Sequence, residues 1–124
     1  MSVQEQFERD VIPTSAGDLA ITFLGHGTLM MAFGGKTIHV DPFSRVADYS
    51  KLPQADIILI THEHRDHLDL QALASVRTER TAVVLTETCA RQIKDGITMQ
   101  NGDVRTVEEV HVEAVPAYNL VHKR

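Results

Sequence analysis

The apolar positions of the chain fall into short runs that turn-forming residues separate. Three of these runs come early, at residues 19–24, 28–33 and 36–40. The pair Gly34-Gly35 between the second and third runs has the chemistry of a tight hairpin turn. The pattern predicts three strands joined as a β-meander, which ends at Pro42 because proline cannot continue a central strand.

Strand and helix patterns then alternate. Further strands are expected at residues 56–60, 81–85, 97–99, 104–107 and 109–115. A short helix is expected over residues 68–76, and a second one from the capping segment at residues 86–88 through Ile93. Asn101-Gly102 predicts a hairpin that joins the strands on either side of it. This order of elements predicts an α/β (α+β) fold with a mixed, mostly antiparallel sheet and short helices on one face.

Size, charge and composition narrow the class of protein. The 124 residues suffice for one domain, which we place at residues 19–124 after a polar lead-in at residues 1–18 with a helical turn near Val3 and Phe7. A net charge of −5 argues against a nucleic-acid surface. Cys89 is the only cysteine, so no internal disulfide can form. With no secretory signal and no apolar run near the roughly 18 residues of a membrane span, a soluble cytoplasmic protein is expected.

The most informative segment follows the apolar run at residues 56–60 and reads Thr61-His62-Glu63-His64-Arg65-Asp66-His67. His62 and His64 are two residues apart, so on an extended segment both imidazoles project from the same side. Imidazole is the commonest nitrogen ligand for divalent cations. A turn into the following helix brings the Asp66 carboxylate and the His67 imidazole toward the same point.

Two interpretations of this segment compete. One is a solvated, charged loop that happens to be rich in histidine, which suits an isolated His-x-His better than three histidines and a carboxylate at the end of a buried strand. The other is a metal site that holds one cation or contributes to two. A hydrolytic site of this kind keeps an open coordination position, where a water molecule reaches a pKa of about 7. Asp66 can then be both a ligand and the residue that orients the water.

The spacing His62-x-His64-x-Asp66-His67 after an apolar strand resembles the signature of the metallo-β-lactamase fold superfamily. Three other blocks are similar to a branch of small metal-dependent hydrolases that includes ascorbate-phosphate lactonase: Leu24-Gly25-His26-Gly27-Thr28, Asp41-Pro42 and Val115-Pro116-Ala117-Tyr118-Asn119. The resemblance covers residues 19–119.

This resemblance implies a dinuclear metal site in which His62 and His64 bind one ion and Asp66 and His67 the other. Zinc is the metal expected, with manganese and iron as alternatives. The implied reaction is attack by a metal-bound hydroxide on an ester, lactone, amide or phosphoester of a small-molecule substrate, with Asp66 as the catalytic residue. A β-lactam substrate is not favoured.

The fold implied by the resemblance is a four-layer αββα sandwich of two similar halves, and the chain looks like the N-terminal half. The family's remaining ligands lie in the second half, so His122 is not assigned as one. Three explanations stay open: a fragment, a truncation, or a homodimer in which a second copy covers the open sheet face. Weak or no activity is expected of this chain alone. The alternative function is a non-catalytic metal-binding or assembly module.

Other residues carry weaker expectations. The resemblance places His26 close to the metals without binding them. Asp41 either orients a metal-bound imidazole or simply forms a turn. His39 and His111 are expected to be structural or surface residues, and Cys89 a small buried hydrophobe.

Overall fold

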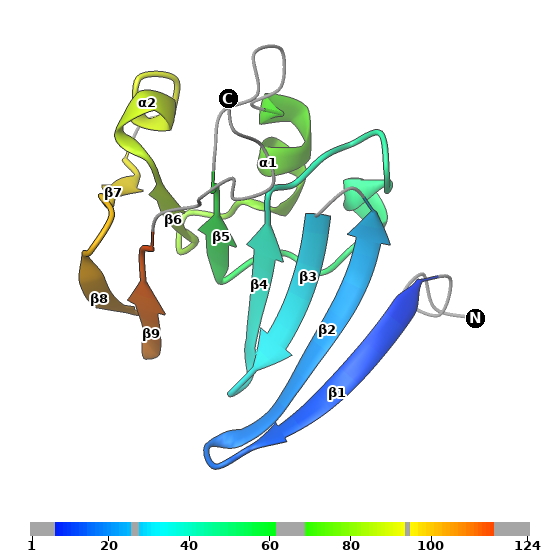
Figure 1. Ribbon diagram of the computed structural model, residues 1–124. Helices are drawn as coiled ribbons and strands as arrows, with labels where there is room; N and C mark the ends of the chain where they lie inside the picture. Colours follow the sequence, from blue (N-terminus) through cyan, green and yellow to red (C-terminus); the bar gives the residue numbers. More distant parts are fainter. Residues whose placement is uncertain (1–6, 26–27, 62–68, 94, 116–124) are drawn as a thin grey trace, which may run out of the picture.

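A single seven-stranded sheet organises the chain, and the computed structural model describes residues 7–25, 28–61, 69–93 and 95–115 of it (Figure 1). The elements in chain order are β1 (Glu8–Thr14), β2 (Gly17–Gly25), β3 (Thr28–Phe33), β4 (Lys36–Val40), η2 (Tyr49–Lys51), β5 (Ile57–Leu59), α1 (Leu70–Val76), β6 (Ala82–Leu85), α2 (Glu87–Ala90), β7 (Ile97–Thr98), β8 (Val104–Val107) and β9 (Val110–Glu113). Strands β8 and β9 form a separate two-stranded sheet.

The large sheet has the spatial order β1-β2-β3-β4-β5-β6-β7, and the pairing changes character in the middle. Strands β1 to β4 pair antiparallel, whereas β4 to β7 pair parallel. The mixed sheet that the sequence predicts is therefore confirmed. Parallel strands end at the same edge of a sheet, so the segments that follow β4, β5 and β6 leave from one edge.

Strand β5 is buried on both faces and separates two apolar clusters. Ile57 and Ile58 are both 0% exposed. Successive side chains of a strand point to opposite faces, and Ile58 joins one cluster with Tyr49 of η2 and Leu73 of α1. Ile57 joins the other cluster, against which the β8–β9 hairpin packs. The sheet thus has a helix side and a hairpin side.

Helix α1 lies between β5 and β6 in the chain, and its sequence explains why a helix forms there. The side chains that face the core are Ala72, Leu73 and Val76, at the spacing of one helical face. The carboxylate of Asp69 caps the helix by accepting a hydrogen bond from the backbone N–H of Ala72 at 2.9 Å. The helix ends at Arg77, whose backbone is extended.

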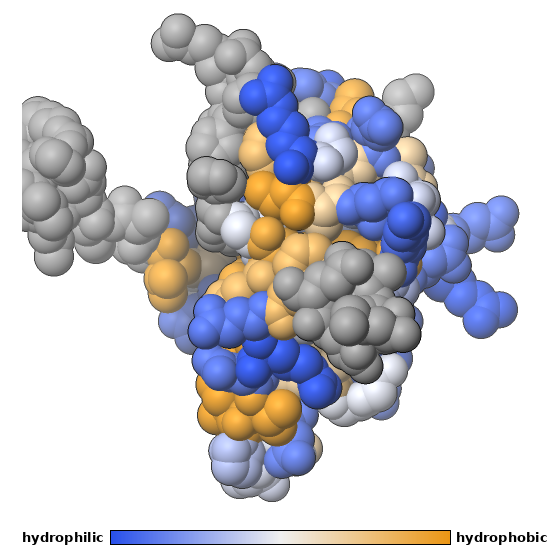
Figure 2. Space-filling model, turned by 90° about the vertical axis from the view of Figure 1, so that its right-hand side faces the viewer, coloured by the Kyte–Doolittle hydropathy of each residue, from blue (hydrophilic) through white to orange (hydrophobic). Residues whose placement is uncertain are grey.

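The polar lead-in predicted at residues 1–18 contains a strand that the sequence analysis did not predict, because residues 8–14 form β1. The helical turn predicted near Val3 lies outside the described residues. Every residue of β1 is exposed, and the strand pairs only with β2. A strand exposed on both faces needs no apolar alternation, and Pro13 is tolerated because β1 is an edge strand. Figure 2 shows the molecule from the β1 side, with apolar patches among charged side chains; Val11 and Ile12 are the exposed large apolar residues of β1.

The predicted hairpin at Asn101-Gly102 is wrong. Strand β7 pairs in parallel with β6, and β8 pairs with β9 instead. The turn of the observed hairpin is Glu108-Glu109, and both residues have positive φ angles, 48° and 71°. Two successive positive φ angles are the geometry of a type I′ hairpin turn. The second predicted helix is shorter than expected, because α2 ends at Ala90.

Among the described residues, no helix has the length and apolar character needed to cross a membrane.

Candidate metal centre

The four predicted metal ligands, His62, His64, Asp66 and His67, lie outside the described residues, as does His26. Their roles therefore stay predictions. Within the described part of the chain, no group of three or more His, Cys, Asp or Glu side chains could hold a metal ion. We define residues 62–68 as the ligand segment. What the structure places is the two residues on either side of it: Thr61, which follows β5, and Asp69, which caps α1.

Asp41 holds Thr61, the residue before the ligand segment. It directly follows β4, and its backbone N–H donates to the Leu59 carbonyl at 2.8 Å. One oxygen of its carboxylate accepts a hydrogen bond from the Thr61 backbone N–H at 2.8 Å, and the other accepts from the Thr61 hydroxyl. Asp41 has a positive φ of 47°, a conformation that aspartate tolerates better than most residues. It is thus more than a turn former, because it holds the residue from which His62 follows.

Asp69, the residue after the ligand segment, is held as well. Its Oδ2 atom accepts hydrogen bonds from the backbone N–H of Ser44 at 2.7 Å and from the Ser44 hydroxyl at 2.8 Å. Partial burial tends to raise the pKa of Asp69, but the hydrogen bonds from Ala72 and Ser44 outweigh it and hold the pKa below its usual value. The carboxylate is therefore ionised at neutral pH and binds both the helix and the segment that follows β4.

The segment that makes both contacts is itself attached to the core. The hydroxyl of Tyr49, a buried residue, accepts a hydrogen bond from the Phe43 backbone N–H at 3.2 Å, and burial raises the pKa of Tyr49 to about 12. The Tyr49 ring lies 5.5 Å from that of His39, measured between centroids. The buried Tyr49 therefore anchors residues 41–44 to the core through Phe43.

His39 of β4 is fully buried. Its Nε2 atom lies 2.9 Å from the carbonyl oxygen of Pro53, so Nε2 carries the proton and donates. The other ring nitrogen, Nδ1, is buried and has no hydrogen-bond partner within the described part of the chain. Burial lowers the pKa of His39, because it disfavours the charged imidazolium. The expectation of a structural rather than ligating role fits this position.

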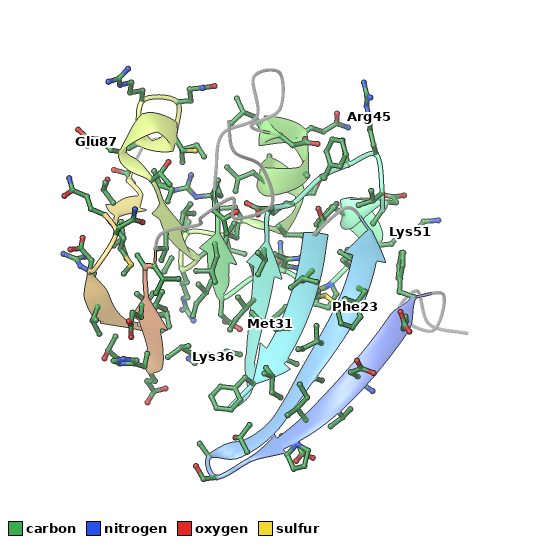
Figure 3. The ribbon with its side chains drawn as sticks, viewed as in Figure 1. Phe23, Met31, Lys36, Arg45, Lys51 and Glu87 are labelled. Carbon is green, nitrogen blue, oxygen red and sulfur yellow. The ribbon has the colours of Figure 1, made fainter. Side chains whose placement is uncertain are left out.

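A groove of about 500 Å³ lies between residues 44–50 and α1, next to the contact of Ser44 with Asp69. Its walls are mostly polar, with Ser44, Ser50, Gln71 and Ser75 among the lining residues. Arg45 stands at its rim, and Figure 3 shows the side chain pointing away from the body of the molecule. The volume is within the range of small-molecule sites.

The donor set of the ligand segment fits a divalent cation. Three imidazoles and one carboxylate are the ligand types that zinc takes in proteins, and manganese or iron accept the same groups. Asp41 accepts hydrogen bonds from Thr61, and Asp69 accepts them from Ser44, so both carboxylates support the residues on either side of the segment.

Sequence reasoning missed part of this arrangement. An aspartate just before an apolar helical pattern is a recognised signal for a helix cap, so the role of Asp69 in α1 was readable. The contact with Ser44 was not, because the two residues are 25 positions apart and nothing local in the sequence pairs them.

Comparison with known proteins places the chain in a family. The model of the beta-lactamase superfamily domain matches residues 20–124. A metal-dependent hydrolase of Pelotomaculum thermopropionicum is 32% identical over 108 residues, which cover 82% of this chain and 47% of the relative. A second, from Flavobacterium johnsoniae, is 44% identical over 63 residues, covering 45% of this chain and 28% of the relative.

Among solved structures, the crystal structure of a candidate metal-dependent hydrolase from Parabacteroides distasonis matches with a TM-score of 0.86 and 43% identity. The match covers 94% of this chain and 54% of that one. The chain thus spans about half the length of relatives that it matches along most of its own length. The signature at residues 62–67 and the mixed sheet agree with these matches: the chain belongs to the beta-lactamase superfamily.

Proposed function

We propose that this chain carries part of the active site of a metal-dependent hydrolase, with His62, His64, Asp66 and His67 as metal ligands. The observation that carries the proposal is how the two residues on either side of the ligand segment are held. Thr61 donates a hydrogen bond to the Asp41 carboxylate, and the Asp69 carboxylate accepts one from Ser44. The names of the relatives support the same activity.

The reaction we propose is hydrolysis of an ester, lactone or phosphoester in a small-molecule substrate. Bound divalent cations, two of them and zinc before manganese or iron, would supply Lewis acidity and a water with a pKa of about 7. Asp66 is proposed to orient that water. Asp41 holds the backbone at the start of the segment, and the polar groove beside Ser44 offers room for a substituent of the substrate.

Metal analysis of the purified chain tests the proposal. We expect the wild-type chain to bind zinc above background and His64→Ala to lose most of it, because one imidazole ligand is gone. The matched control is His111→Ala, since His111 lies in β9 and is exposed. A folded wild-type chain that binds no zinc, manganese or iron would contradict the proposal.

Turnover separates the enzyme from the alternative of a non-catalytic metal-binding module. A panel of generic phosphodiesters and lactones is assayed with the metal-loaded chain and with His64→Ala. Turnover that disappears in the variant supports the enzyme, whereas metal binding without any turnover favours the module. The relatives are named as hydrolases, which supports the enzyme. That the chain alone is weakly active stays a prediction.

The homodimer and the cytoplasmic location also stay predictions. Light scattering at micromolar concentration tests the dimer, and a monodisperse, folded monomer would remove it.

A further inference from the structure

One contact near the ligand segment does more than helix capping requires. A helix cap needs one carboxylate oxygen, and Oδ1 of Asp69 serves in this way by accepting from Ala72. The second oxygen, Oδ2, accepts two more hydrogen bonds, both from Ser44, at 2.7 and 2.8 Å. One carboxylate therefore joins the start of α1 to the segment that leaves β4.

The contact between Ser44 and Asp69 lies next to the ligand segment in the chain. Asp69 follows the segment directly, and Thr61, which precedes it, is held by Asp41. Asp41 and Ser44 are only three residues apart, so one short stretch of chain fixes both neighbours of the segment. Holding the two ends of a loop removes conformational freedom before any ligand binds. Less entropy is then lost when the loop binds a metal, which raises the affinity.

We propose that Ser44 and Asp69 form a positioning pair, which raises the affinity of the ligand segment for its metal without contributing a ligand. The proposal rests on the proposed function, because it takes His62 to His67 as the metal site. Removing residues that orient metal ligands typically lowers metal affinity by about 10–100-fold. Ser44 does not follow from the ligand pattern, because the partner that it binds, Asp69, lies 25 positions away and next to the segment.

The chain contains a matched control for this contact. The Ser50 hydroxyl donates to Asp48 at 2.5 Å, and the Ser50 backbone N–H donates to the same oxygen at 3.1 Å. This second serine–aspartate pair has the same chemistry as the first, but it caps the start of η2 and not the start of α1. Ser50→Ala thus removes an equivalent hydroxyl.

The experiment measures the zinc affinity of the full chain by competition with a chromophoric chelator. We expect Ser44→Ala to lose about tenfold in affinity, whereas Ser50→Ala stays within about twofold of the wild type. Ser44→Thr keeps the hydroxyl and should restore most of the affinity. Thermal unfolding of the zinc-free proteins checks that Ser44→Ala is folded, and Asp69→Asn, which retains a good capping residue, serves as the second variant if it is not.

The outcomes separate the two proposals. Wild-type zinc binding with unchanged affinity in Ser44→Ala would overturn the positioning role and leave the proposed function intact. An equal loss in Ser50→Ala would overturn it too, because the effect would then be general. A folded wild-type chain that binds no zinc would overturn both.

Discussion

At the scale of single residues, buried polar groups set how the site region responds to its surroundings. His39 is fully buried, donates to the Pro53 carbonyl and has no partner for Nδ1 within the described residues. Protonating Nδ1 would bury a positive charge and an N–H donor without a partner among the described residues, which costs stability. The residue therefore links the stability of this region to pH.

We predict that His39 makes the fold less stable in mild acid. Burial lowers the pKa of His39 in the folded state, whereas the unfolded chain keeps the usual value of about 6.5. Between these two values the unfolded state binds more protons, so the free energy of unfolding falls as pH drops below about 6.5, by at most about 1.4 kcal/mol per pH unit. Above pH 6.5 this contribution is fully present.

Urea unfolding of the wild type and of His39→Gln from pH 8 to pH 5 measures this effect. Glutamine keeps a donor for the Pro53 carbonyl but does not titrate, so the curve of the variant should be flatter in mild acid. Parallel curves would show that His39 does not carry the pH dependence.

A second prediction at this scale concerns Asp41, which combines a positive φ with two hydrogen bonds to Thr61. Asp41→Ala loses both hydrogen bonds from Thr61. Alanine also adopts a φ of 47° less readily than aspartate, so we expect the free energy of unfolding to fall by about 2 kcal/mol. Asp41→Asn tolerates the same φ and keeps one acceptor, so it should lose less than half as much.

Chemical denaturation at pH 7 measures both Asp41 variants, with Thr61→Val as the control that removes only the hydroxyl. Equal losses in Asp41→Ala and Asp41→Asn would show that the backbone conformation contributes little.

At the scale of elements, the hairpin β8–β9 shows how turn residues and strand pairing compete. Both turn residues, Glu108 and Glu109, adopt positive φ angles that glycine and asparagine would adopt at lower cost. Glu109 also forms an exposed ion pair with Lys36 at 3.7 Å, and such pairs contribute little. The turn is therefore strained for its sequence.

We predict that the double variant Glu108→Asn, Glu109→Gly is more stable than the wild type by about 1 kcal/mol, because Asn-Gly is the preferred type I′ pair. Thermal and urea unfolding measure the gain. Lys36→Gln removes the ion pair alone and should change stability little. A double variant less stable than the wild type would mean that the Lys36 contact outweighs the strain of the turn.

The same hairpin marks the limit of prediction from the sequence. Apolar runs gave strands β3 and β4 with their observed bounds, because each run is short and flanked by turn residues. Asn101-Gly102 has stronger turn chemistry than Glu108-Glu109, so local signals favoured the wrong hairpin. What decides the pairing is the long-range parallel contact of β7 with β6, which no local pattern encodes. Strand β1 was missed for a related reason, since its exposed faces require no apolar alternation.

The candidate site was predictable to a similar degree. Ligand chemistry is local, so residues 62–67 could be predicted as a metal site from their residue types, their spacing and the apolar strand before them. This stays a prediction, because these residues lie outside the described part of the chain. The supporting contacts are not local: Thr61 meets Asp41 across 20 positions, and Asp69 meets Ser44 across 25.

At the scale of the whole molecule, the sheet carries an apolar cluster on each face, and β5, the strand that precedes the ligand segment, contributes to both. One cluster is covered by α1 and η2, and the other by β8–β9. Ile57 and Ile58 are neighbours in β5, equally buried, and point to opposite faces. Truncating each isoleucine in turn therefore compares the packing of the two faces with the same side chain in the same strand.

We predict that Ile57→Ala and Ile58→Ala each lower the free energy of unfolding by about 2–5 kcal/mol, the range for truncating a fully buried isoleucine. If both faces belong to one cooperative unit, each variant shifts a single unfolding transition and leaves the urea m-value unchanged. Urea unfolding followed by far-UV circular dichroism measures both quantities. A loss below about 1 kcal/mol for Ile57→Ala alone would mean that the β8–β9 hairpin detaches from the sheet before the sheet unfolds. The cavity left by Ile57 would then be open to water and would cost little in the global transition. An equal, large loss would instead show that β8–β9 is bound as firmly as α1, and that the strand leading into the ligand segment is supported from both sides.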